Sequence, residues 1–262
     1  MKKTTKIVVF SLCVFLLISI LIGVAFFVAK QDNTKGLYFR KMYGSIGIVN
    51  NVEYTMQMVL YSFEEKVDFL NDLDNISFDN KAVSITNISY KVQSTENDLT
   101  IYSVLVSLKL QKQGRHIVNY LNYNGQTENL EDESFCLGEL CFIYEGTENE
   151  FIQHGCNTNI DNGEAVFTFS ADNTKAFTII DTIVDGRNIK YEYNKNVHFT
   201  PGTDLTYIIN VDSSVSKYDL LLLQPIFVIE YEDAEEYNYF SPYMIVYSGV
   251  DMTYDEIKEY VK

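Results

Sequence analysis

The chain has 262 residues, with 36 Asp and Glu against 20 Lys and Arg, and a formal net charge of −16 at pH 7. So acidic a protein repels the phosphates of nucleic acids, which excludes a basic nucleic-acid-binding surface of the usual kind. Hydrophobic residues make up 47 % of the chain and aromatic residues 14 %, which is enough to build a substantial core.

The first predicted element is an apolar run from Ile7 to Ala29, which contains no charged residue. Seventeen of its 23 residues are Leu, Ile, Val or Phe. At about 1.5 Å per residue, a helix of this length would be about 34 Å long, enough to span a hydrocarbon layer of about 30 Å. We therefore expect a transmembrane anchor at residues 7–29, through which the protein contacts the membrane.

A cleaved secretory signal is the alternative, but the apolar core of a signal is usually about 7–15 residues long. Gly23 and Ala25, the one pair of small residues with the spacing of a cleavage site, lie inside the run. Both flanks carry similar positive charge, yet a short basic tail resists translocation, whereas a large domain crosses largely regardless of its charge. We expect residues 1–6 to be cytoplasmic and the C-terminal domain to be extracytoplasmic, at the cell membrane.

Residues 30–47 are polar, basic and without periodicity, which predicts a juxtamembrane tether whose Leu37, Phe39 and Tyr43 can dock on the domain. A strand is predicted at Tyr54–Tyr61. The sequence from Ser62 to Glu65 fits a capping box, and apolar residues at helical spacing follow it. This pattern predicts a short helix at about Phe63–Leu73.

Further along the chain, apolar and polar residues alternate, which predicts antiparallel strands that bury one face. The alternation is clearest at Tyr102–Leu110, Ile189–Tyr193 and Leu205–Val211. A change in the phase of the apolar residues near Asn87 predicts a β-bulge. Turn signals occur at Asn124-Gly125, Asn162-Gly163, Asp185-Gly186 and Pro201-Gly202.

Two features are predicted near the end of the chain. Pro225 cannot lie within a central strand, so it is expected to mark an edge or the start of the strand Ile226–Tyr231. A second capping box, from Thr253 to Glu256, predicts a terminal helix. Its apolar stripe consists of Ile257, Tyr260 and Val261.

Together these elements predict a mainly β fold. We expect an antiparallel β-sandwich, built as one large or two small lobes, with two short helices and one preceding transmembrane helix. If there are two lobes, they cover residues 48–157 and 158–262, and the second includes the C-terminal helix.

The stretch Ala82–Val92, followed by Tyr102–Leu110, resembles the opening hairpin of the immunoglobulin-like ectodomains of membrane-anchored Gram-positive envelope proteins. The Pro201-Gly202 turn before Leu205–Val211 is similar to the later part of such a domain. The Cys–Trp–Cys core of antibody domains is absent, since the chain has no Trp. The resemblance implies an envelope-facing binding or scaffolding role.

Three cysteines follow the apolar run: Cys136, Cys141 and Cys156. A turn at Leu137–Leu140 would bring Cys136 and Cys141 together in a disulfide, which is the pairing that we expect. A bond between Cys141 and Cys156 is the alternative, and all three stay reduced if the domain meets no oxidising system. His154 would also allow a Cys₃His zinc site, but the spacing matches no common zinc ribbon, so we expect no metal.

The sequence contains no G-x-S-x-G elbow, H-E-x-x-H helix or Gly-rich phosphate loop. We therefore expect no catalytic residue, no cofactor and no enzymatic activity. The sequence predicts a non-catalytic binding or scaffolding role in the cell envelope, with an unknown envelope protein or polymer as the partner and no nucleic acid. The alternative is a surface hydrolase that uses a pair of Asp or Glu carboxylates.

Overall fold

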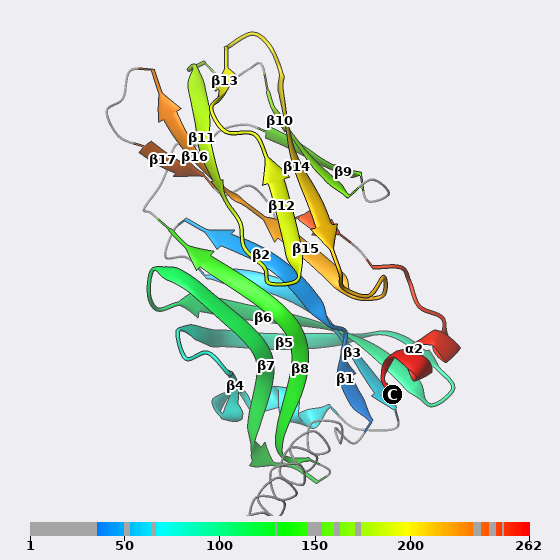
Figure 1. Cartoon of the computed structure of the whole chain (residues 1–262). Coiled ribbons are helices and arrows are strands. Elements are labelled where there is room, and N and C mark those ends of the chain that lie inside the picture. Colours follow the sequence, from blue (N-terminus) through cyan, green and yellow to red (C-terminus); the bar gives the residue numbers. More distant parts are fainter. Residues whose placement is uncertain are drawn as a thin grey trace, which may run out of the picture.

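A computed structural model of the chain describes residues 36–49, 53–63, 67–128, 130–145, 154–159, 163–170, 174–232, 237–240, 245–247 and 249–262. This part of the chain is mainly β, as predicted, with four sheets and a single α-helix among the residues described (Figure 1). The expected anchor at 7–29 lies outside these residues. Within them, no helix combines the length and the apolar character needed to cross a membrane.

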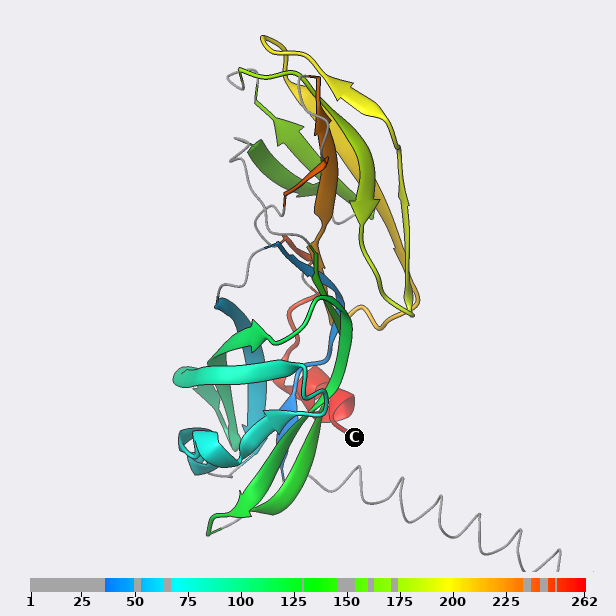
Figure 2. The same ribbon diagram turned by 90° about the vertical axis from the view of Figure 1, so that its left-hand side faces the viewer.

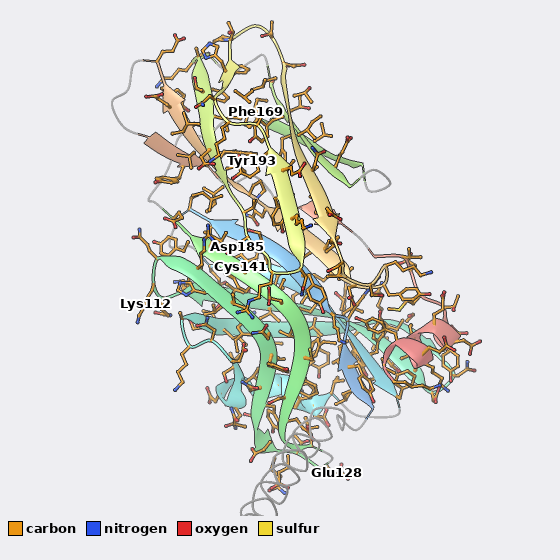
Figure 3. All side chains as sticks on the ribbon, viewed as in Figure 1. Lys112, Glu128, Cys141, Phe169, Asp185 and Tyr193 are labelled. Atoms are coloured by element: carbon orange, nitrogen blue, oxygen red, sulfur yellow. The ribbon has the colours of Figure 1, made fainter. Side chains whose placement is uncertain are left out.

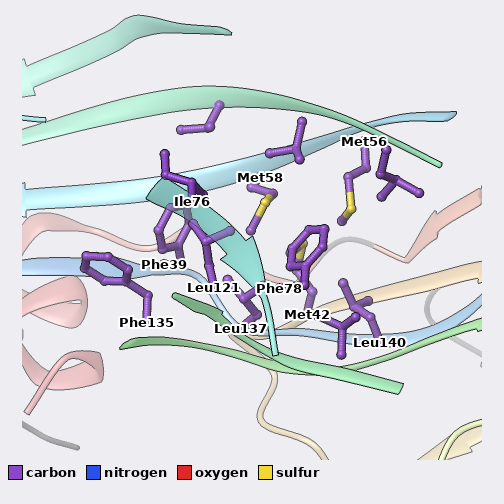
Figure 4. Close-up of a cluster of buried hydrophobic side chains, with 14 of the residues drawn as sticks. Phe39, Met42, Met56, Met58, Ile76, Phe78, Leu121, Phe135, Leu137 and Leu140 are labelled. Atoms are coloured by element: carbon purple, nitrogen blue, oxygen red, sulfur yellow. The ribbon is translucent and has the colours of Figure 1, made fainter. Parts of the chain in front are cut away.

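Two sheets occupy the lower part of Figure 1 and share one hydrophobic core. The first sheet contains, in spatial order, β1 (Leu37–Phe39), β3 (Tyr54–Phe63), β6 (Leu99–Leu110) and β5 (Val83–Glu96). The second contains β18 (Ile245–Tyr247), β15 (Leu220–Gln224), β2 (Met42–Ile48), β8 (Glu131–Tyr144), β7 (Gly114–Gln126) and β4 (Ile76–Phe78). Figure 4 shows side chains of this core, which come from both sheets.

The other two sheets occupy the upper part of Figure 1, and Figure 2 shows the two parts one above the other. The third sheet contains β12 (Ile189–Tyr193), β14 (Leu205–Ser213), β10 (Glu164–Phe169) and β9 (His154–Asn159). The fourth contains β13 (Val197–Phe199), β11 (Phe177–Ile183), β16 (Ile226–Tyr231) and β17 (Tyr237–Phe240). Aromatic rings fill this second core; Phe167 and Phe227, for example, meet edge to face at 5.1 Å.

The two parts are not consecutive halves of the chain. In the lower part, β2 pairs in parallel with β8 on one side and with β15 on the other. Only Pro225 separates β15 from β16, which belongs to the upper part. The C-terminal helix α2 (Tyr254–Tyr260) also returns to the lower part, where it packs near Tyr61 and Leu99. The predicted division at residues 157 and 158 therefore does not match the fold, because the last third of the chain contributes to both parts.

Glycines make the parallel pairing of β2 possible. Gly44 and Gly138 both have positive φ angles, of 148° and 96°. A Cβ atom at Gly44 would collide with the carbonyl oxygen of Leu222 in β15, and one at Gly138 would collide with the carbonyl oxygen of Met42 in β2. The backbones of β15, β2 and β8 thus approach each other at positions where no side chain fits.

The tether predicted at residues 30–47 is wrong from Leu37 onward, because this stretch forms β1 and β2. Leu37, Phe39 and Met42 are almost completely buried in the core. Since β2 lies between two other strands and is buried on both faces, its sequence lacks the alternation that marks a half-exposed strand.

The α-helix predicted at about Phe63–Leu73 is also wrong. Ser62 does not cap a helix, because it is a buried residue of β3 and pairs with Leu37 of β1. Two short 3₁₀ helices follow instead: η1 (Asp68–Asn71) and η2 (Leu73–Asn75). In η1, the adjacent residues Phe69 and Leu70 are both buried. One short turn of helix can bury two consecutive side chains in this way. Glu65 lies outside the described residues.

Most other predicted elements are confirmed. Strands occur at all three alternating segments and at Ile226–Tyr231, directly after Pro225. The register between β5 and β6 shifts between Ile85 and Asn87, as expected for a bulge. The signals at Asp185-Gly186 and Pro201-Gly202 lie between strands, whereas Asn124-Gly125 lies within β7, and Asn162 is outside the described residues.

Candidate functional site

The main candidate site is a cavity of about 360 Å³ beside β1, in the lower part of the molecule. Its volume is at the lower end of the range for small-ligand sites. Leu37, Tyr38 and Phe39 of β1 form one wall. A second wall is formed by Tyr260, Val261 and Lys262, which follow from α2. We call this cavity the β1 cavity.

Aromatic side chains form much of the remaining lining of the β1 cavity. Phe135 of β8 is buried and meets Phe39 edge to face, with ring centroids 5.6 Å apart. Phe135 also stacks on Phe69 of η1 at 5.0 Å, so these rings form a fixed, tightly packed base. Three further residues line the cavity: half-buried Tyr120 of β7, exposed Cys136 of β8 and Lys41. Cys136 follows Phe135 in the chain, and Lys41 adds a positive charge. Because Leu37, Phe39 and Phe135 are almost fully buried, the surface that the cavity offers to a ligand is mixed, with both polar and apolar groups.

A buried polar cluster holds the C-terminal wall in place. The hydroxyl of Tyr260 donates a hydrogen bond of 2.6 Å to Oδ1 of Asp219, a residue that is only 5 % exposed. The same hydroxyl accepts a hydrogen bond of 2.9 Å from the backbone N–H of Lys41. Burial, together with the hydrogen bond to Asp219, raises the pKa of Tyr260 well above its usual value. The hydroxyl therefore stays protonated and connects α2 to the segment between β1 and β2.

Arg40 extends this cluster. Its guanidinium group is buried and donates from Nε to the carbonyl oxygen of Tyr218, at 2.7 Å, and from Nη2 to that of Val250, at 2.9 Å. Both distances are typical of charge-assisted hydrogen bonds. Arg40 thus ties together the β1–β2 connection, the turn before β15 and the segment that leads to α2.

Helix α2 is also attached at its exposed side. Thr253 and Glu256 form the predicted capping box, which is confirmed. The hydroxyl of Tyr254 donates a short hydrogen bond to Asp98, and the ammonium of Lys258 lies 3.3 Å from the same carboxylate. The hydrogen bond from Tyr254 is the main cause that lowers the pKa of Asp98. Asp98 lies in the turn between β5 and β6, so these contacts attach α2 to the first sheet.

The predicted disulfide between Cys136 and Cys141 is not formed, because both cysteines are free. The turn expected at Leu137–Leu140 is absent; these residues are part of the continuous strand β8. At about 3.3 Å per residue, an extended strand places the two Cα atoms on the order of 15 Å apart, well beyond the about 7 Å that a disulfide allows. Because Cys141 is free, the alternative bond between Cys141 and Cys156 is not formed either. The side chains of His154 and Cys156 lie outside the described part.

Cys141 lies instead at the boundary between the two parts, near Asp185 in the loop between β11 and β12 (Figure 3). Burial is the main cause that raises the pKa of its thiol to about 12. The backbone N–H of Asp185 donates to the hydroxyl of Ser45, at 3.0 Å, and Arg115 forms an ion pair of 2.8 Å with the Asp185 carboxylate. These contacts hold the loop against β2 and β7.

A second cavity of about 360 Å³ lies where β14 meets the turn before β15. Asp212 and Asp219 both contribute to its lining. Asp219 is already engaged, because it accepts hydrogen bonds from Tyr260 and, at 3.3 Å, from the backbone N–H of Ser216. Among the residues that the structure describes, no three His, Cys, Asp or Glu side chains form a group that could hold a metal ion.

Sequence reasoning did not identify the β1 cavity, because its walls are more than 200 residues apart in the chain. The capping box at Thr253 was the one relevant signal, since it located the helix that ends at the cavity. Residues 37–41, which form the other wall, were assigned to the tether.

Comparison with known proteins adds little. No protein-family model matches the chain, and no curated protein sequence matches it significantly. One similar solved structure is the crystal structure of a protein of unknown function from Porphyromonas gingivalis W83. It is 9 % identical, with a TM-score of 0.23, and the match covers 79 % of this chain and 97 % of that one. At this TM-score, the likeness supports no conclusion about fold or function.

Proposed function

We propose that this protein is a non-catalytic binding or scaffolding module of the cell envelope, tethered to the membrane by residues 7–29. The observation that carries the proposal is the β1 cavity, which offers a mixed surface of polar and apolar groups to a small ligand or a protruding partner side chain. The cavity adjoins the first described strand, so it lies within a few residues of the proposed anchor. The partner would be an envelope protein or polymer held close to the membrane.

The short basic tail supports this arrangement, because such a tail resists translocation, whereas a large domain crosses a membrane largely regardless of its charge. Three of the 20 basic residues precede the apolar run, while all 36 acidic residues follow it. We propose that the basic tail, residues 1–6, is cytoplasmic and that the acidic β-rich body is extracytoplasmic. The acidic body also disfavours nucleic acids as partners.

We further infer that each pair of sheets is an immunoglobulin-like β-sandwich. Immunoglobulin constant domains place strands A, B, E and D in one sheet and C, F and G in the other. In the lower part, β1-β3-β6-β5 follows the order A-B-E-D, and β4-β7-β8 follows C-F-G, with β2, β15 and β18 added beyond β8. In the upper part, β9-β10-β14-β12 and β11-β16-β17 follow the same orders, with β13 added at an edge. This agreement in strand order supports an immunoglobulin-like sandwich. In this assignment, β5 and β6 correspond to strands D and E, and not to the opening hairpin that their sequence resembles.

Site-specific photo-crosslinking tests the binding role. A photoreactive phenylalanine analogue would replace Tyr38, in the wall of the cavity, in the full chain in living cells. The control position is Thr206, an exposed residue of β14 in the upper part. We expect irradiation to yield a discrete crosslinked product from Tyr38 and none from Thr206. No product from Tyr38, or equal products from both positions, would refute a partner at this cavity.

A surface hydrolase is the alternative function, because Asp212 and Asp219 line the second cavity together. A carboxylate pair of this kind is the minimum that glycoside hydrolysis needs. If the purified chain degraded envelope polysaccharide and Asp212→Asn abolished that activity, the alternative would replace the binding role.

A further inference from the structure

We propose that the last fourteen described residues, 249–262, form a lid over the β1 cavity, and that this lid opens as a unit to admit the ligand. We call these residues the C-terminal strap. The inference rests on the proposed function, in that it assigns a means of access to the same cavity. It concerns a movement, however, that can be measured without a ligand.

The first observation is the position of the strap. Tyr260, Val261 and Lys262 form one wall of the cavity, and β1 forms the other. β1 is a three-residue edge strand that pairs on one side with β3. Displacement of the strap would therefore remove one wall of the cavity and uncover the free side of β1.

The second observation is that little apolar surface holds the strap. In α2, only Ile257 is fully buried, against Tyr61 and Leu99. The strap residues Met252, Tyr254, Tyr260 and Val261 are only partly buried. A helix of seven residues is too short to be stable by itself, so α2 exists only while these contacts persist. Segments of this type open at a lower free energy than the core of a protein.

The third observation is that, beyond Val250, which Arg40 holds at the base of the strap, polar side chains fasten the strap at two separate points. At one point, the hydroxyl of Tyr260 connects Asp219 with the backbone of Lys41, at 2.6 and 2.9 Å, and the neighbouring Tyr218 donates to Glu256 at 2.9 Å. At the other, Tyr254 and Lys258 contact Asp98. Each point depends on a few side chains, so a single substitution can weaken it while the remainder of the fold keeps its contacts.

Hydrogen exchange measured by mass spectrometry on the full chain in detergent tests the lid. Tyr260→Phe removes the hydroxyl from the first fastening point. Tyr207→Phe is the matched control, because the Tyr207 hydroxyl also takes part in two hydrogen bonds, both of 2.7 Å, but in the upper part. We expect Tyr260→Phe to speed exchange in α2 and β1 by about tenfold or more and to leave β10 unchanged. Tyr207→Phe should not affect α2 or β1 selectively.

Asp98→Ala gives an independent variant that removes the acceptor at the second fastening point, in case Tyr260→Phe fails to fold. It should also speed exchange in α2 while β10 stays protected. The lid is refuted if either folded variant leaves exchange in α2 at the wild-type rate, or if exchange rises equally throughout the chain.

The same variants separate this inference from the proposed function. If the strap is a lid, Tyr260→Phe should also speed photo-crosslinking from Tyr38. Rapid exchange in α2 without any crosslink from Tyr38 would refute the partner at the cavity but leave the mobile strap intact. A crosslink from Tyr38 whose rate does not respond to Tyr260→Phe would refute the lid but leave the binding role intact.

Discussion

The hydroxyl of Tyr260 donates a hydrogen bond to the buried carboxylate of Asp219, which precedes it by 41 residues. This contact joins the C-terminal helix to the turn before β15. After β15, the chain continues through Pro225 into the upper part. Through the backbone of Lys41, the same hydroxyl also reaches the connection between β1 and β2. The side chain of Tyr260 thus connects three segments: the β1–β2 connection, the turn before β15 and the C-terminal helix.

Tyr260→Phe should lower the free energy of unfolding by about 1.5–3 kcal/mol, because a buried carboxylate loses a hydrogen-bond donor. Urea denaturation followed by circular dichroism measures this change. Tyr38→Phe is the control in the same region, since it removes a half-exposed hydroxyl and should change stability by less than about 0.5 kcal/mol. Equal effects of the two substitutions would contradict the role given to Tyr260.

Gly44→Ala should destabilise the protein by about 3 kcal/mol or more, because the added methyl group would collide with the carbonyl of Leu222. Gly202→Ala is the matched control: Gly202 also has a positive φ angle, of 87°, but a Cβ atom there meets nothing within 4 Å. It should cost only about 1 kcal/mol for backbone strain. Thermal unfolding distinguishes the two. A mild effect at Gly44 would argue against the parallel pairing of β2 and β15.

Tyr207 and Thr182 should be energetically coupled. The Tyr207 hydroxyl donates to the carbonyl of Asn194 and also shares a hydrogen bond of 2.7 Å with the buried hydroxyl of Thr182. Tyr207→Phe should cost about 1–3 kcal/mol, since it leaves the other polar groups without their partner. Thr182→Val and the double variant complete a double-mutant cycle. We expect the double variant to be more stable than the sum of the single effects implies, by about 0.5 kcal/mol or more. Strict additivity would contradict the shared hydrogen bond.

The attachment of the C-terminal strap should weaken in acid. The hydrogen bond from Tyr254 is the main cause that lowers the pKa of Asp98. The hydrogen bond from the backbone of Thr253 is the main cause that lowers the pKa of Glu256. A carboxylate with a lowered pKa stabilises the folded state above its unfolded pKa of about 4, and this contribution is lost as the pH falls through the folded value. Hydrogen exchange in α2, corrected for its intrinsic pH dependence, should therefore rise below about pH 4. Asp98→Asn should reduce this rise, and an identical rise in that variant would contradict the account.

The sequence predicted those elements whose signal is local. Ile189–Tyr193 bury one face and expose the other, so their alternation identified β12. The Thr253 capping box identified α2 because both of its partners lie within four residues. β1 and β2 were missed because β2 is enclosed by β8 and β15, and burial on both faces removes the alternation.

The site could not be predicted for a related reason. The cavity depends on contacts such as that between Lys41 and Tyr260, and nothing in either segment specifies the other. Pro225 was correctly assigned to the start of a strand. The strand just before it, β15, pairs in parallel with β2, which begins at residue 42. Such pairing depends on the backbone, so a glycine at a close approach, such as Gly44, is its only sign in the sequence.

The central claim, an acidic β-rich body outside the cytoplasmic membrane, is tested most directly by labelling intact cells with a membrane-impermeant maleimide. Labelled residues would be mapped by peptide mass spectrometry, with Cys136→Ser as the control. The account predicts that exposed Cys136 is labelled before lysis, while Cys141, whose burial keeps its pKa at about 12, is labelled only after denaturation. Labelling of Cys136 only after lysis would place the body inside the cell and contradict the account.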